Sequence, residues 1–113
     1  MENITIQDIE KIVREVRGIT KNELRQRTKQ HPIAHARGII YYFCLKHGVE
    51  KGNLRILAEA YGLTHSSVLN QRKRIQNFID TKDPDYYDDI IMIGLKIMSF
   101  VSHKHDFTNI PQF

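Results

Sequence analysis

The stretch LRILAEAYGLTHSSVLNQRKRI, from Leu54 to Ile75, decides the fold. In a helix-turn-helix two helices cross steeply, which requires a small residue at the crossing, a glycine in the turn and a branched apolar residue in the second helix. Ala58, Gly62 and Val68 meet these requirements in that order. The pattern predicts helices over 54–61 and 64–79. An ordinary helical hairpin is the alternative, because these three residue types are common.

The second helix carries the functional prediction. Helical rotation from Val68 turns a polar side outward, and Thr64 is suited to cap the helix start. The residues expected to contact DNA on this side are Thr64, His65, Ser66, Ser67, Asn70, Lys73 and Arg74. A solvated surface helix normally pairs Glu with Lys, but the sequence has no acid between Glu59 and Asp80. This absence favours a groove flanked by phosphates over a solvated face.

Helical patterns fill the rest of the chain, and strand patterns are lacking. We expect a helix over 5–16, a short helix after Thr20, a helix from His31 to Gly48 and a last helix over 86–102. The predicted fold class is all-α, a five- to six-helix orthogonal bundle that contains the helix-turn-helix. We expect one DNA-binding domain over 1–79 and a C-terminal helical extension over 80–113.

Positive charge is concentrated in the middle of the chain. Residues 21–76 hold eleven Lys or Arg and three Glu, whereas the whole chain has a formal net charge of +4. Such segregation indicates a surface that binds a polyanion. The basic string of Arg25, Arg27 and Lys29 is expected to lie in a loop and to contact DNA. RNA is a weaker alternative, because the basic face shows no aromatic residues for base stacking.

Several ordered motifs resemble the C-terminal DNA-binding domain of the bacterial chromosomal replication initiator DnaA. The run Thr64-His65-Ser66-Ser67-Val68 is similar to the Asp-His-Thr-Thr-Val signature of that family. The motifs Ile4-Thr5-Ile6-Gln7-Asp8-Ile9, Ala34-His35-Ala36-Arg37 and Lys73-Arg74-Ile75 match further family motifs in the same order. The resemblance implies a Trp-repressor-like fold. It also implies that the helix after Thr64 reads the major groove.

The resemblance carries further expectations for single residues. Lys29 matches an Arg that enters the minor groove in the family, and Arg37 belongs to a matched basic motif. The chain lacks the phosphate-binding loop of an ATPase, so we expect no nucleotide and no cofactor. The expected function is sequence-specific binding of double-stranded DNA by a stand-alone module that regulates replication initiation or transcription.

Other classes of protein are disfavoured. The histidine pairs lack the further ligands of a metal site, and neighbouring His65 and Ser66 point apart on a helix, so we expect neither a metal nor an enzyme. The lone Cys44 lies in an apolar run typical of a core. No apolar stretch is long enough to span a membrane. A reduced cytoplasmic protein is expected.

The last predicted helix is unusually apolar. Nine of the twelve residues from Ile90 to Val101 are apolar, more than the usual stripe of a surface helix. Either the helix packs deeply on its own domain, or residues 86–102 form a homodimer that places two recognition helices on one face. A helical protein–protein adaptor that uses this helix is the alternative function.

Overall fold

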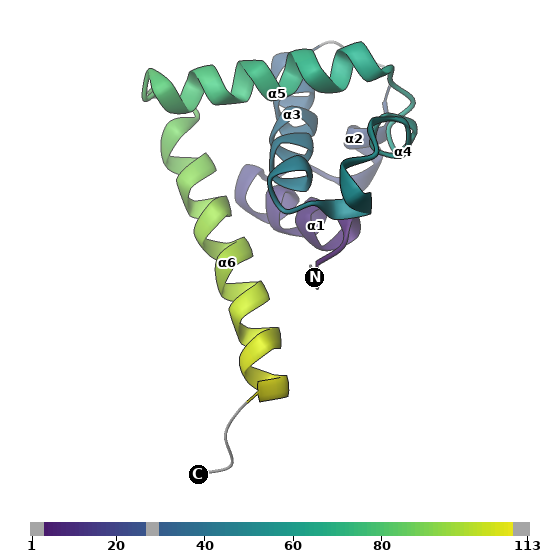
Figure 1. Ribbon diagram of the computed structural model, residues 1–113. Coiled ribbons are helices and arrows are strands. Elements are labelled where there is room, and N and C mark those ends of the chain that lie inside the picture. The colour runs from purple at the N-terminus through teal and green to yellow at the C-terminus, as the bar shows by residue number, and fades with distance from the viewer. Residues whose placement is uncertain (1–3, 27–29, 110–113) are drawn as a thin grey trace.

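The computed structural model describes residues 4–26 and 30–109, with side chains up to residue 102. Every regular element in these ranges is helical. The elements are α1 (Ile6–Arg17), α2 (Lys21–Arg25), α3 (His31–Lys46), the 3-10 helix η1 (Val49–Gly52), α4 (Leu54–Glu59), α5 (His65–Asp80) and α6 (Tyr87–Asn109). α5 lies across one end of the molecule with α3 beneath it, and α6 descends from the C-terminal end of α5 (Figure 1). The predicted all-α fold is confirmed.

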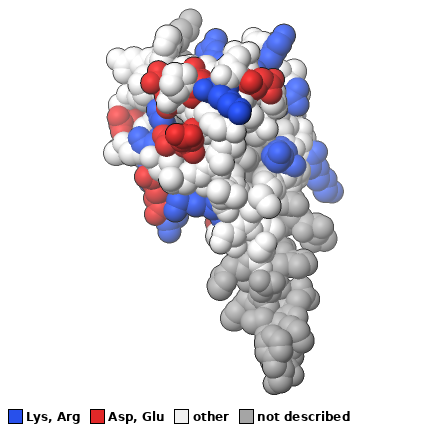
Figure 2. Space-filling view, turned by 90° about the vertical axis from the view of Figure 1, so that its left-hand side faces the viewer, with Lys and Arg blue, Asp and Glu red and all other residues white. Residues whose placement is uncertain are grey.

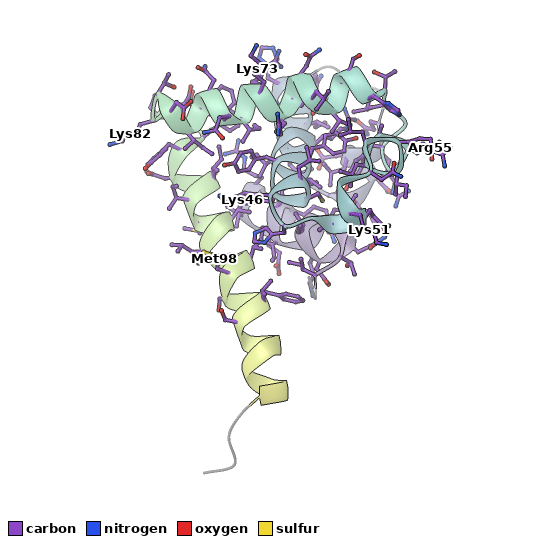
Figure 3. The ribbon with its side chains drawn as sticks, viewed as in Figure 1. Lys46, Lys51, Arg55, Lys73, Lys82 and Met98 are labelled. Carbon is purple, nitrogen blue, oxygen red and sulfur yellow. The ribbon has the colours of Figure 1, made fainter. Side chains whose placement is uncertain are left out.

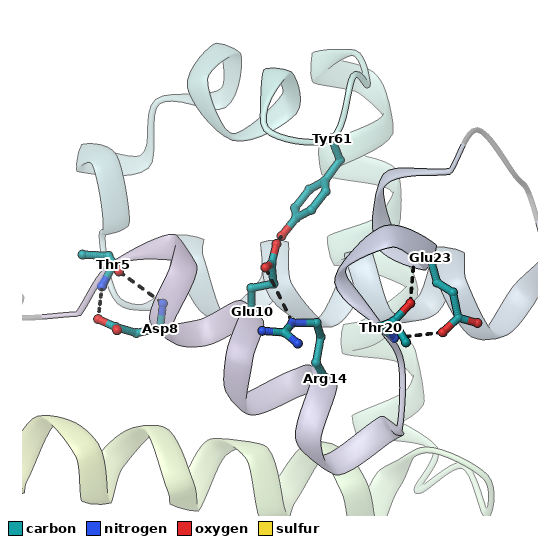
Figure 4. Close-up of polar contacts among 7 residues, drawn as sticks. All are labelled: Thr5, Asp8, Glu10, Arg14, Thr20, Glu23 and Tyr61. Atoms are coloured by element: carbon teal, nitrogen blue, oxygen red, sulfur yellow. Dashed lines mark hydrogen bonds and ion pairs between the residues drawn. The ribbon is translucent and has the colours of Figure 1, made fainter.

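Capping boxes begin the first two helices. The Thr5 hydroxyl accepts from the Asp8 amide at 3.2 Å, and the Thr5 amide donates to the Asp8 carboxylate at 3.0 Å. Thr20 and Glu23 form the same reciprocal pair at 3.1 and 2.8 Å (Figure 4). Each box supplies partners to amides that would otherwise lack them at a helix start.

α3 is the central helix of the bundle. Ile39, Ile40 and Tyr41 are fully buried, because α1, α2 and α5 all pack around this helix. Gly38 allows the closest approach to α5, since a Cβ atom there would lie 3.1 Å from Ile75. Cys44 is a buried free cysteine, and burial raises its pKa to about 12. Its thiol therefore packs in the core as expected.

One side of α6 belongs to the same core. Ile90, Ile93 and Ile97 are buried in one apolar cluster with residues of α1, α3 and α5. The Arg17 guanidinium forms an ion pair with Asp89 at 2.5 Å, which joins α1 to the start of α6. The C-terminal helix thus packs on its own domain.

The other side of α6 stays open. Its exposed apolar stripe consists of Ile91, Met92, Leu95 and Met98, of which Leu95 is 61% and Met98 59% exposed. Figure 2 shows the side of the molecule that lies on the left in Figure 1. Charged side chains gather over its upper part, and mostly uncharged side chains form the surface below them. An apolar stripe of this kind is typical of a protein interface.

An aromatic cluster fills the junction of α3, α5 and α6. The His35 ring packs edge-on against Phe78 at 5.0 Å and against Tyr86 at 4.8 Å, and it stacks on His31 at 5.3 Å. The Arg17 guanidinium lies 4.5 Å from the centre of the Tyr86 ring. Burial, and then the nearby Arg74, lower the pKa of His35 from 6.5 to about 4. The imidazole is therefore neutral at physiological pH.

The element boundaries differ from the expectations at several places. α3 ends at Lys46 rather than at Gly48. α4 ends at Glu59 rather than at residue 61, because Leu63 donates its amide back to the Ala58 carbonyl and turns the chain. The 3-10 helix η1 was not predicted, and the last helix continues to Asn109. None of the helices in the described ranges combines the length and the apolarity needed to cross a membrane.

Candidate nucleic-acid interface

The helix-turn-helix has the predicted geometry. Leu57 and Ala58 of α4 are buried, Gly62 adopts the left-handed conformation with φ at 68°, and Val68 of α5 is fully buried. Tyr61 and Leu63, which flank the turn, pack against the core. A side chain at Gly62 would be strained, because only glycine adopts a positive φ without a steric penalty. The three residue types that suggested the motif occupy the positions it requires.

Thr64 begins the recognition helix. Its hydroxyl oxygen accepts from the Ser67 amide at 3.2 Å and lies 3.1 Å from the Ser67 hydroxyl. Thr64, His65 and Ser66 are exposed, while Ser67 is half-buried. The first turn of α5 therefore presents small polar side chains and backbone amides beside the positive end of the helix dipole. An anion or the edge of a base can approach this end.

The outer side of α5 is open along its length. Asn70, Lys73 and Arg74 are exposed, and the only buried side chains of α5 are Val68 and Ile75. The helix carries no acid before Asp80, its last residue. α6 leaves α5 at its C-terminal end and lies below it, so it does not cover this side (Figure 1). The structure thus brings the seven predicted residues from Thr64 to Arg74 together on one helix.

The predicted basic loop is only partly described. Arg25 was expected in this loop, but it is the last residue of α2, and its side chain is exposed. Arg27 and Lys29 lie outside the described residues. Their expected contacts with DNA stay predictions.

Arg37 is placed differently from the expectation. Its side chain is only 3% exposed, its Nε donates to the Leu24 carbonyl at 2.8 Å, and its Nη2 donates to the Gln26 carbonyl. Carbonyls at the end of a helix such as α2 lack hydrogen-bond donors within the helix, and the Arg37 guanidinium donates to them instead. Desolvation by burial lowers the pKa of Arg37. The side chain points inward, so Arg37 does not lie on the exposed surface of the molecule in this structure.

A partly buried hydrogen bond joins α1 to the turn before α5. The Tyr61 hydroxyl donates to a Glu10 carboxylate oxygen at 2.5 Å, and the Arg14 Nε lies 3.7 Å from the other oxygen (Figure 4). Burial, together with this hydrogen bond, raises the pKa of Tyr61, which keeps the hydroxyl protonated as a donor. α1 thereby positions the turn that carries the recognition helix.

Two exposed cations near α5 were not among the residues that the sequence pattern selected. Lys46 ends α3, and Arg72 lies on the flank of α5. Helical rotation from Val68 puts Arg72 close to the inward side, so the pattern gave no reason to select it. The segregation of charge along the chain was the one available signal for both residues.

The arrangement of α4, the turn at Gly62 and α5, with Ala58 and Val68 buried between the two helices, defines the class of helix-turn-helix domains. The sequence profile of the family described as bacterial dnaA protein helix-turn-helix matches residues 6–75. The chain belongs to this family. Its helix-turn-helix is thus a DNA-binding domain, a kind of domain that is not itself catalytic. Searches of curated proteins and of solved structures gave no match.

Proposed function

We propose that this chain binds double-stranded DNA sequence-specifically through the outer side of α5 and thereby regulates replication initiation or transcription. The single observation that carries the proposal is the exposed, acid-free side of a recognition helix in a DnaA-type helix-turn-helix. Carboxylates would repel phosphates on both sides of the groove, and their absence here removes that repulsion. The proposed place of action is the cytoplasm, and no nucleotide takes part.

Different residues of the interface serve affinity and sequence preference. We expect Ser66 and His65, near the helix start, to reach base edges, and Thr64 and Ser67 lie beside them. We expect Asn70, Lys73 and Arg74, farther along α5, to meet phosphates. Arg25 adds an exposed cation at the end of α2. Thr64 stands where the family signature has Asp, so the preferred DNA sequence should differ from that of the initiator.

The exposed apolar stripe on α6 supports a homodimer as the second part of the proposal. Leu95 and Met98 are more than half exposed although they are large and apolar. A second copy of the chain presents the same stripe, and two equal stripes can cover each other about a two-fold axis. Such a dimer carries two recognition helices for two half-sites. A helical adaptor, in which the stripe binds another protein, is the competing function.

The experiment that tests DNA binding is selection of bound duplexes from a random-sequence pool, followed by salt titration of the selected duplex. We expect enrichment of a defined sequence and an affinity that falls steeply with salt, with a log–log slope of about −0.9 for each phosphate contacted. Lys73→Ala should make this slope about 0.9 less steep and weaken all duplexes alike. Ser66→Ala should alter the sequence preference instead.

The competing function, a helical adaptor, predicts a different outcome. A chain that is only an adaptor should bind neither the pool nor a random duplex at low salt. Such a lack of binding would contradict the proposed function. If duplex binding occurs but both substitutions leave it unchanged, the assignment of the outer side of α5 is wrong.

A further inference from the structure

A basic hollow lies beside the outer side of α5. It has a volume of about 640 Å³ and is bounded by the last turns of α3 and by one flank of α5. We call it the α3–α5 hollow; its cations are Lys46, Arg72 and Lys73, and its apolar side chains are Tyr42, Leu45 and Leu69. Figure 3 labels Lys73 on α5 and Lys46 below that helix. Asn70 and Lys73 border both the hollow and the outer side of α5, so the two surfaces are continuous.

The hollow carries positive charge without a counter-charge. No acidic residue lines it, and none of its three cations forms an ion pair within the described part of the chain. Lys46 is exposed, with its ammonium 5.9 Å from the centre of the Tyr42 ring. The ring attracts the ammonium without neutralising it. Three neighbouring cations without acids favour an anionic occupant.

The floor of the hollow narrows the choice of anion. Leu69 is 41% exposed, whereas the other exposed side chains of α5 are polar, and Tyr42 and Leu45, which line the same hollow, are half-buried. A free phosphate ion would leave this apolar surface in water. A sugar–phosphate backbone offers phosphate oxygens to the cations and the carbon face of a deoxyribose to the apolar side chains. The position beside the recognition helix is where a phosphate strand borders the groove in a helix-turn-helix complex.

We infer that the α3–α5 hollow seats the sugar–phosphate backbone of the strand that borders the groove entered by α5. Lys46 and Arg72 bind its phosphates, and Leu69 contacts a sugar. The inference rests on the proposed function and extends the interface from α5 to the C-terminal end of α3. These contacts strengthen binding to every duplex alike, because phosphates carry no sequence information.

The test compares single-residue variants of the full chain on the duplex selected from the random pool. Lys46→Ala should make the log–log salt slope about 0.9 less steep, so that its loss of affinity from 50 to 200 mM salt is about 3.5-fold smaller than that of the wild type. Arg72→Ala should act in the same way, and Lys46→Arg should restore the wild-type slope. Leu69→Ala should weaken binding by the same factor at every salt concentration, so that the slope does not change. The order of preference among duplexes should not change.

Lys11→Ala is the matched control, because Lys11 is an exposed cation on α1. The helix α1 lies at the opposite end of the bundle from α5 (Figure 1). It should leave the slope unchanged, and thermal melting should show that every variant is folded. An unchanged slope for Lys46→Ala, with the expected change for Lys73→Ala, would overturn the inference and leave the proposed function standing. If that unchanged slope comes with weaker binding of poly-glutamate, the hollow binds an acidic protein segment instead. A wild-type chain that binds no duplex would remove both proposals.

Discussion

α5 and α6 are both long helices with one buried and one open side, but their open sides are opposite in chemistry. α5 buries Val68 and Ile75 and presents mainly amides, hydroxyls and cations to solvent, with Leu69 as its one exposed large apolar side chain. α6 buries Ile90, Ile93 and Ile97 and presents an apolar stripe. Water solvates the open side of α5 well, whereas exposure of the stripe on α6 is unfavourable. The difference indicates two kinds of partner, a polyanion for α5 and an apolar protein surface for α6.

The double substitution Leu95→Lys with Met98→Lys should have the largest effect, because it replaces the apolar chemistry that distinguishes the open side of α6 from that of α5. If the stripe pairs with a second copy, two buried charges should weaken the dimer by about 4 kcal/mol, or roughly a thousandfold in dissociation constant. Light scattering over a range of concentrations measures the change. The folded monomer should keep its melting temperature, because both side chains are exposed in one chain.

Gln7→Lys adds a charge to the exposed side of α1 and should leave the dimer intact. The monomeric double variant should still bind one half-site, because α5 is unchanged. A wild-type chain that stays monomeric at every concentration would remove the dimer and leave DNA binding untouched.

His35 lies where α5 and α6 meet. Its titration should make the free energy of unfolding depend on pH. The pKa of His35 is lowered from 6.5 to about 4, so below pH 6.5 the unfolded chain takes up a proton that the folded chain excludes. Its effect is absent above pH 6.5. As the pH falls from 6.5 to 4, it should lower the free energy of unfolding by at most about 1.4 kcal/mol per pH unit.

The variant His35→Phe isolates this effect, because it keeps an aromatic ring against Phe78 and Tyr86 but cannot titrate. Chemical denaturation at several pH values gives the difference between wild type and variant, in which the titration of other groups cancels. The nearby charges that act on His35 are Arg74, His31, Arg17 and Asp83, and they are the same in both proteins. Equal pH dependence of the two proteins would show that the imidazole takes up its proton in the folded state.

Tyr61→Phe should loosen the attachment of the helix-turn-helix to α1. The change deletes the hydroxyl that donates to Glu10 and leaves a buried carboxylate oxygen without that donor. We expect a loss of about 2 kcal/mol in the free energy of unfolding. Tyr87→Phe, which removes a hydroxyl from a half-buried ring at the start of α6, should change it far less. Urea denaturation of both variants gives the comparison, and equal losses would contradict the role of the buried bond.

Local signals in the sequence predicted most of the fold. Capping residues such as Thr5 and Thr20, and the glycine in the turn at Gly62, act through neighbours three or four residues away, so their effect can be recognised in one chain. The polar side of α5 was predicted for the same reason, since rotation about a helix follows from spacing alone. α6 contains more apolar residues than the single buried stripe of a surface helix. This content indicated that a second side of α6 would also be covered.

Contacts between distant parts of the chain could not be predicted. Arg37 was expected to contact DNA because it belongs to a motif that resembles the DnaA family, but its side chain is buried and donates to the carbonyls of Leu24 and Gln26. The pairing of Tyr61 with Glu10 joins residues 51 positions apart. The α3–α5 hollow depends on how two helices cross, which spacing along one helix does not contain.

Thr64→Ala should have the smallest effect on the free energy of unfolding, and this effect should come from the start of α5 alone. The hydroxyl that accepts from the Ser67 amide is lost, which costs about 1 kcal/mol in the free energy of unfolding. Thr64→Asp is the matched variant, because Asp caps a helix at least as well and also interacts with the helix dipole, so stability should be kept. Repeating the duplex selection with Thr64→Asp should then favour cytosine, whose amine a carboxylate accepts. An unaltered sequence preference would show that the first residue of the recognition helix does not reach the bases, and that α5 reads DNA from positions farther along.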